Sequence, residues 1–128
     1  MFKTVHSVDE LVQVYKFLSD VPNTNLPKIK KFIRRLVKHG IVYVAYEKKK
    51  MIACIVFDIR EKYVSLPNLY VDKKFRFKHV VLKDLLDSIR YIQQKYSDKH
   101  VYTMSDNINE YKHFVIPVRD NIYRVKDL

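Results

Sequence analysis

The chain has 128 residues, 48% of them hydrophobic, so we expect one hydrophobic core and a single domain over residues 1–128. Its 25 Lys and Arg against 14 Asp and Glu give a net charge of +11, which favours anionic partners such as nucleic acid, acidic protein surfaces or phosphorylated cofactors. The one cysteine excludes an internal disulfide and a cysteine-based metal cluster, and the longest apolar run, Met51 to Phe57, is too short to span a membrane.

The N-terminal part is predicted to form a strand and two helices. A strand at Phe2 to His6 leads into a capping box at Ser7 to Glu10, in which the Ser hydroxyl accepts from a backbone amide and Glu10 reaches back. The helix that follows has its apolar face at Val8, Leu11, Val12, Tyr15 and Leu18. After a turn at Asp20 to Pro27, a second helix is expected from about Lys28 to a stop at Gly40. Its apolar stripe is Ile29, Phe32, Ile33, Leu36 and Val37.

The rest of the chain is predicted to be mostly strands. Ile41 to Tyr46 and Met51 to Ile59 form a hairpin around a charged turn, and Tyr63 to Val71 forms a third strand. Pro67 and Asn68 interrupt that strand, which predicts a bulge, an edge or a splay. The remaining expected elements are a helix from about His79 to Tyr96, a strand at His100 to Thr103, a short helix from Asn107 to about Val115, and a hairpin of Val115 to Asp120 and Ile122 to Val125. The order β-α-α-β-β-β-α-β-α-β-β indicates an α+β fold in three layers.

The junction of the third strand and the long helix is the strongest functional signal. A short apolar strand, Leu69 to Val71, runs through a basic loop, Asp72 to Lys78, directly into the helix. Backbone N–H groups without partners and the positive end of the helix dipole meet there, so the pattern predicts an anion site.

The order of elements and three segments resemble the GNAT superfamily of acetyl-CoA-dependent N-acetyltransferases. VYVAYEKKKMIACIVF is similar to the family's second and third strands, and LPNLYVDKKFRFKHVVLKDLL to its fourth strand, pyrophosphate loop and third helix. Arg76 matches the first position of the loop pattern Q/R-x-x-G-x-G/A, whereas His79 and Val81 stand where the glycines belong. YKHFVI is similar to the family's Y-x-x-x-G-F segment, which aligns Tyr111 with its tyrosine.

The resemblance implies a mixed, mostly antiparallel sheet with a central splay, in which acetyl-CoA lies between the third-strand end and the strand at His100. Peptide groups of the strand would bind the pantetheine, and the loop and first helical turn would face the pyrophosphate. The implied cofactor residues are Leu69, Val71, Arg76, Phe77, Lys78, His79, Val80 and Val81. It also implies an amine acceptor and a role for Tyr111 as the general acid that protonates the leaving CoA thiolate. No metal site is expected, because no group of residues has metal-ligand spacing.

Each of these residues also has a plainer interpretation. Arg76 and Lys78 fit a solvated basic loop, His79 fits an ordinary residue at a helix start, and the spacing of Tyr111 from Ile108 and Val115 fits a core position. Among the acids, Asp58 is the one inside a strand, where its alternation with Phe57 and Ile59 is typical of a side chain that faces water. The sequence therefore names no general base.

A second hypothesis is a non-catalytic protein that has kept this fold and lost the cofactor loop. The second helix carries six basic residues on its predicted outer face, which would bind nucleic acid or an acidic protein, and not a membrane: Lys28, Lys30, Lys31, Arg34, Arg35 and Lys38. The bias towards Lys, Asn, Ile and Tyr suggests an A/T-rich genome, as in many bacteriophages or their hosts. The N-terminus has no signal-peptide pattern, so we expect a protein of the cytoplasm or, if it is encoded by a phage, one associated with the virion.

Overall fold

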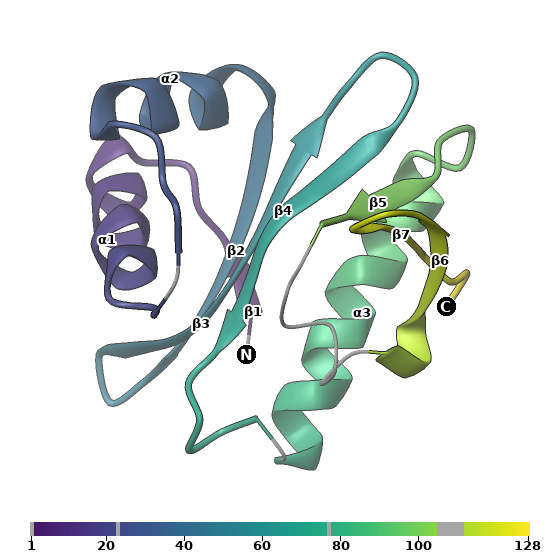
Figure 1. Cartoon of the computed structure of the whole chain (residues 1–128). Coiled ribbons are helices and arrows are strands. Elements are labelled where there is room, and N and C mark those ends of the chain that lie inside the picture. The colour runs from purple at the N-terminus through teal and green to yellow at the C-terminus, as the bar shows by residue number, and fades with distance from the viewer. Residues whose placement is uncertain (1, 23, 77, 105–111) are drawn as a thin grey trace.

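The computed structural model describes residues 2–22, 24–76, 78–104 and 112–128. Within these ranges seven strands form one sheet in the order β1-β2-β3-β4-β5-β7-β6. The strands are β1 (Phe2–Thr4), β2 (Gly40–Glu47), β3 (Lys50–Ile59), β4 (Val64–Val71), β5 (Val101–Thr103), β6 (Val115–Arg119) and β7 (Ile122–Val125). The helices are α1 (Val8–Ser19), α2 (Ile29–His39) and α3 (His79–Lys95), with a 3-10 turn, η2 (Lys112–Phe114), before β6. Figure 1 shows α1 and α2 on one side of the sheet and α3 on the other.

The predicted order of elements is confirmed in the described part of the chain, with small shifts at the ends. The expected helix from Asn107 to about Val115 lies mostly outside the described residues, and Val115 already belongs to β6. The α1 cap is confirmed in part. The Ser7 hydroxyl accepts a hydrogen bond from the Glu10 N–H at 3.1 Å, whereas the Glu10 carboxylate accepts from the Tyr46 hydroxyl at 3.4 Å instead of reaching back.

Gly40 ends α2 for a steric reason that differs from the predicted one. Its backbone is extended (φ −91°, ψ 147°), so the left-handed conformation of a helix-capping glycine is absent here. A Cβ at this position would lie 2.7 Å from the Leu36 Cα and 2.8 Å from the Leu36 carbonyl oxygen. The chain therefore needs glycine where it turns from α2 directly into β2.

The β2–β3 hairpin forms as predicted, and its turn uses lysines where glycine is usual. Lys48 and Lys49 both adopt positive φ angles, of 48° and 68°. β3 lies inside the sheet between β2 and β4, and both of its faces are buried, which explains the continuous apolar run from Met51 to Phe57. Side chains on one face of β3 pack with α1 and α2, and those on the other face pack with α3.

Two positions in the expected apolar stripe of α2 are corrected by the structure. Phe32 and Leu36 are buried and Ile33 is half-buried, but Ile29 is 38% and Val37 64% exposed. The reason is that α2 makes a narrow contact with the rest of the protein. The helix packs on α1, β2 and β3, and these elements cover only the middle of its apolar stripe.

The predicted interruption of β4 is confirmed as a bulge followed by a divergence of two strands. Two residues of β4, Leu66 and Pro67, stand opposite Phe57 of β3. On its other side β4 pairs in parallel with β5 from Val64 to Leu66 and no further. Beyond this point β4 continues to Val71, and the edge formed by residues 67–71, which we call the free edge, pairs with no other strand among the described residues.

Candidate functional site

The free edge of β4 presents the peptide groups of Leu69 and Val71. The Asp72 N–H donates to the Ile52 carbonyl at 2.7 Å, and hydrogen-bonded pairs alternate along an antiparallel ladder. Tyr70 and Asn68 therefore exchange hydrogen bonds with β3, while Leu69 and Val71 direct their N–H and C=O groups away from it. A second observation supports this direction for Val71, because its carbonyl accepts a hydrogen bond from Arg76 Nε at 2.9 Å.

The loop after β4 turns tightly and delivers the chain to α3. Asp72 organises the turn: its carboxylate accepts from the Lys74 N–H at 3.0 Å, and its carbonyl accepts from the Phe75 N–H at 2.8 Å. Lys78 is the N-cap residue of α3 and makes no side-chain capping bond. The first turn of α3 contains no acidic residue, so nothing in it offsets the positive end of the helix dipole.

The first turn of α3 has backbone N–H groups at its N-terminal end that take no part in the helical hydrogen bonds. The first hydrogen bond inside the helix runs from the Leu82 N–H to the Lys78 carbonyl, so the N–H groups of residues 79 to 81 precede the helical ladder. The side chain of Val81 is only 2% exposed and packs with Val71, Ile52 and Ala53. His79 and Val80 are exposed. The branched side chain in the second glycine position thus points into the core, away from the helix end.

Arg76 does not extend into solvent from the loop. Besides its bond to the Val71 carbonyl, its guanidinium lies over the Tyr70 ring, 5.3 Å from the ring centroid. The Lys78 ammonium likewise lies 4.8 Å from the centroid of Phe75. Arg76 thus ties the end of β4 to the loop. The predicted site residues Phe77 and Tyr111 lie outside the described residues.

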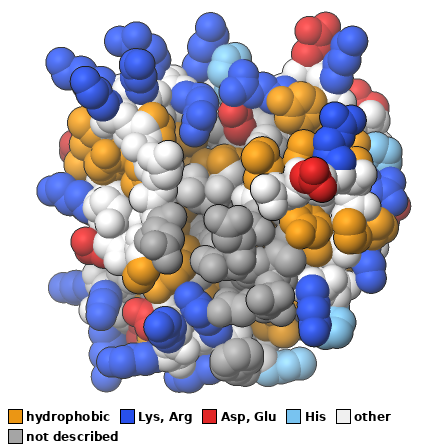
Figure 2. Space-filling view, in the orientation of Figure 1, with side chains coloured by type: hydrophobic (Ala, Val, Ile, Leu, Met, Phe, Trp, Pro, Cys, Tyr) orange, Lys and Arg blue, Asp and Glu red, His pale blue; other side chains and the backbone are white. Residues whose placement is uncertain are grey.

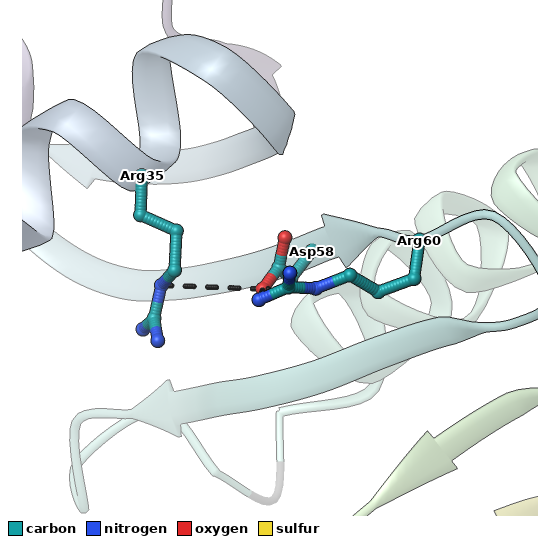
Figure 3. A network of polar contacts seen from close by, with 3 residues as sticks. All are labelled: Arg35, Asp58 and Arg60. Atoms are coloured by element: carbon teal, nitrogen blue, oxygen red, sulfur yellow. Dashed lines mark hydrogen bonds and ion pairs between the residues drawn. The ribbon is translucent and has the colours of Figure 1, made fainter.

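The prediction that the Asp58 side chain faces water is wrong. It is 4% exposed, and its Oδ2 accepts hydrogen bonds from Arg60 Nη2 at 2.8 Å and Arg60 Nε at 3.1 Å. Arg35 Nε lies 3.9 Å from the same oxygen (Figure 3). Asp58 Oδ1 and Arg35 Nε are buried and have no hydrogen-bond partner among the described residues. Alternation alone missed this network because it depends on α2, a distant segment that packs over this end of β3.

The basic face of α2 is smaller than predicted, because Arg35 turns towards Asp58 and is half-buried. The other five basic side chains are exposed: Lys28, Lys30, Lys31, Arg34 and Lys38. Figure 2 shows Lys and Arg side chains gathered along the upper edge of the molecule, over α2.

Other chemistry is limited in the described part of the chain. Cys54 is fully buried, and burial raises the pKa of its thiol, so it is a core residue as predicted. No group of His, Cys, Asp and Glu among the described residues could hold a metal ion. None of the helices described is long and apolar enough to cross a membrane.

Solved structures similar to this one include acetyltransferases of the GNAT family. GCN5 from Tetrahymena superposes with a TM-score of 0.71 at 14% identity, covering 100% of this chain and 98% of that chain. A GNAT-family acetyltransferase from Staphylococcus aureus Mu50 superposes with a TM-score of 0.69 at 14% identity, covering 97% of this chain and 96% of that chain. Arabidopsis thaliana NAA60, solved in complex with a bisubstrate analogue, superposes with a TM-score of 0.67 at 14% identity, covering 93% of this chain and 86% of that chain. No family model and no curated protein matches the sequence. The chain has the GNAT fold, as its resemblance to that superfamily implied.

Proposed function

We propose that the protein is an acyl-CoA-dependent N-acyltransferase that transfers an acetyl group from acetyl-CoA to an amine. One observation carries the proposal: the free edge of β4 leads straight to the uncapped start of α3. A ligand with amide groups in an extended arm and a pyrophosphate at one end is complementary to this pair of features, since the arm can add to the strand edge and the pyrophosphate can lie at the helix end. The GNAT fold of the similar structures supports the same function.

In the proposed arrangement the pyrophosphate lies at the N–H groups of residues 79 to 81. The pantetheine arm follows β4 backwards past Val71 and Leu69, and the thioester then lies near the bulge at Leu66 and Pro67. The amine attacks the thioester carbonyl carbon, a C–N bond forms, and the C–S bond breaks. A base takes the proton from nitrogen, and the Tyr111 hydroxyl, as the resemblance implies, gives a proton to the leaving thiolate. We assign no residue as the base.

Binding of acetyl-CoA tests the proposal, with two variants that separate the site from the stability of α3. Val80 is 59% exposed in the first turn of α3, where Val80→Glu places a carboxylate that favours the helix but repels a pyrophosphate. Tyr91 is 54% exposed near the other end of the same helix, so Tyr91→Glu adds the same charge away from the site. We expect acetyl-CoA to bind to the wild-type protein with micromolar affinity in calorimetry. Two unit charges about 5 Å apart in a partly solvated site repel strongly enough to weaken binding roughly tenfold or more in Val80→Glu.

The melting temperature provides the internal check of this experiment. Val80→Glu should melt no lower than the wild type, because a negative charge near a helix N-terminus is stabilising by about 0.3–1 kcal/mol. Tyr91→Glu should bind acetyl-CoA as the wild type does. No binding heat at millimolar acetyl-CoA, or equal affinity in Val80→Glu and the wild type, would contradict the proposal. The first result would favour the non-catalytic use of this fold.

A second candidate function, binding of nucleic acid, is favoured by the charge pattern of α2. The helix contains no acidic residue, and three like-charged pairs stand at i, i+4 spacing: Lys30 with Arg34, Lys31 with Arg35, and Arg34 with Lys38. Each such pair destabilises an isolated helix by about 0.2–0.5 kcal/mol. A phosphate backbone along α2 would relieve this repulsion.

Fluorescence anisotropy with single- and double-stranded oligonucleotides tests this candidate. Binding should be independent of base sequence, and its logarithm should fall steeply and linearly with the logarithm of the salt concentration. Changing Lys30, Lys31 and Arg34 together to Gln should reduce the steepness of this line, the slope of the logarithm of the binding constant against the logarithm of the salt concentration, by about two to three. Binding that is absent at low salt, or that is unchanged in the triple variant, would remove α2 as a nucleic-acid interface.

A further inference from the structure

One row of side chains crosses the sheet at the point where β4 and β5 begin to diverge. Residues that stand directly opposite one another on neighbouring strands project from the same face. The register aligns Asp58 of β3 with Ser65 of β4, Ser65 with Tyr102 of β5, Tyr102 with Arg124 of β7, and Arg124 with Ile116 of β6. Asp58 contacts Arg35 of α2, so the whole row lies on the face of the sheet that carries α1 and α2.

Among the described residues, this face is the less covered route to the thioester in the proposed arrangement. On the opposite face, Val64, Leu66 and Val71 are buried, and Leu69 packs in the same hydrophobic cluster as the α3 side chains Leu85 and Ile89. An amine that approaches from there would have to displace α3. On the face of the row, Ser65 and Tyr102 are half-buried, and neither belongs to the hydrophobic cluster that contains the α1 and α2 side chains. The acceptor therefore meets the thioester beside Ser65.

The charges around Ser65 are mostly positive. Neighbouring strands are about 5 Å apart, so the backbone of Arg124 lies about 10 Å from that of Ser65, across Tyr102, and an arginine side chain can span much of that distance. On the other side stands Asp58, whose carboxylate is already bound by Arg60 and lies next to Arg35. Both arginines keep part of the side chain in solvent, with exposures of 37% for Arg35 and 41% for Arg60. Three guanidinium groups and one carboxylate leave this row and its partners with a net charge of +2.

The buried carboxylate holds Arg60 by hydrogen bonds and has Arg35 beside it. Asp58 receives two hydrogen bonds from the fork of Arg60, and the Arg35 side chain reaches it from α2 (Figure 3). A guanidinium that is already oriented loses less conformational freedom when it binds a carboxylate or phosphate. Asp58 is thus a positioning residue for Arg60, and its carboxylate is too deeply buried to meet a cationic acceptor.

We infer that the acceptor is an amine that carries acidic groups close to the nitrogen that is acetylated, such as the N-terminus of an acidic peptide. This inference rests on the proposed acyltransferase function. Arg124 on one side of Ser65, and Arg35 with Arg60 on the other, bind the acidic groups and hold the amine between them. Polycationic acceptors are disfavoured, because each added positive charge meets guanidinium groups in a partly buried site.

Matched bisubstrate conjugates test the inference by binding alone, so no turnover is needed. Coenzyme A is joined through an acetyl linker to the N-terminal amine of three peptides: Ala-Asp-Asp-Ala, Ala-Asn-Asn-Ala and Ala-Lys-Lys-Ala. Dissociation constants are measured by calorimetry at 150 mM salt for the wild type, Arg124→Gln, Arg60→Gln and Arg34→Gln. Arg34 is exposed on α2, so Arg34→Gln removes the same charge from a surface outside the row.

The Asp conjugate should bind about tenfold more tightly than the Asn conjugate, in keeping with hydrogen bonds between charged groups, and the Lys conjugate most weakly. Arg124→Gln and Arg60→Gln should each reduce the ratio of Asp to Asn affinity by about threefold or more. Arg34→Gln should leave that ratio within about twofold of the wild type, since surface charges outside contact distance are screened.

Three results would overturn the inference. The first is that the Lys conjugate binds as tightly as the Asp conjugate or more tightly, and the second is that the ratio of Asp to Asn affinity is unchanged in both Arg124→Gln and Arg60→Gln. The third is that a protein that binds acetyl-CoA binds none of the conjugates. The third result would mean that the acceptor does not approach from this face. A protein that binds neither acetyl-CoA nor the conjugates would refute the proposed function itself, and the inference with it.

Discussion

Asp58→Asn should destabilise the fold, and the structure gives the size of the effect. The substitution keeps the shape of the side chain but removes the charge that Arg60 binds at 2.8 and 3.1 Å and that Arg35 approaches at 3.9 Å. Breaking a fully buried ion pair costs about 3–5 kcal/mol. Both arginines are more than a third exposed and regain water, so we expect a loss of about 2 kcal/mol.

Thermal unfolding measures this loss. An unfolding entropy of about 2.1 cal/mol/K per residue gives about 0.27 kcal/mol/K for 128 residues, so about 2 kcal/mol lowers the melting temperature by roughly 7 °C. Asp87→Asn is the control, since the Arg90–Asp87 pair on α3 has a similar separation of 3.2 Å but side chains that are 47% and 48% exposed. It should change the melting temperature by less than about 2 °C.

The interpretation of the network fails if Asp58→Asn melts no lower than Asp87→Asn. A double-mutant cycle of Asp58→Asn with Arg60→Gln gives a further check, because two groups in contact should show a coupling free energy of about 1 kcal/mol or more. Coupling near zero would mean that the two groups contribute independently and that Asp58 does not hold Arg60 in place.

Gly40→Ala should cost about 1–3 kcal/mol in chemical denaturation, because the new Cβ would lie 2.7 Å from the Leu36 Cα; an unchanged denaturation midpoint would show that α2 shifts without strain. Burial, and then the Glu10 carboxylate, raise the pKa of Tyr46 above its usual 10.0. The stability that comes from this raised pKa is complete below pH 10 and is lost as the pH rises through the raised pKa. Tyr46→Phe should therefore make the stability fall less steeply above pH 10 than in the wild type. An equally steep fall in both proteins would contradict this role of Tyr46. Cys54 should react with a thiol reagent only on unfolding, because it is fully buried and its pKa is raised; reaction in the native protein at the rate of a free thiol would contradict its place in the core.

Local patterns in the sequence were sufficient to predict most of the fold. The Ser7 cap, the apolar run of β3 and the Pro67 interruption each depend on neighbours in the chain, and each appears in the structure where it was expected. The reason for Gly40 could not be predicted, because the close contact with Leu36 arises only once α2 and β2 have their final directions.

The candidate site was predictable in its backbone and less so in its side chains. Leu69, Val71 and Lys78 were named because the sequence resembles the GNAT superfamily, and the structure places them along the edge of β4 and at the start of α3. The inward packing of Val81 and the tie between Arg76 and Val71 depend on the angle at which α3 meets the sheet. No pattern within one segment encodes that angle.

Hydrogen exchange of individual β4 amides, followed by NMR with and without acetyl-CoA, tests the central claim most directly. The N–H groups of Leu69 and Val71 face the free edge, whereas those of Asn68 and Tyr70 already pair with β3. The account predicts that saturating acetyl-CoA slows exchange at Leu69 or Val71 by at least about tenfold, and at Asn68 and Tyr70 by less, because the pantetheine arm adds to the free edge like another strand. Acetyl-CoA that binds without protecting either amide, or that protects all four equally, would contradict a cofactor site along β4.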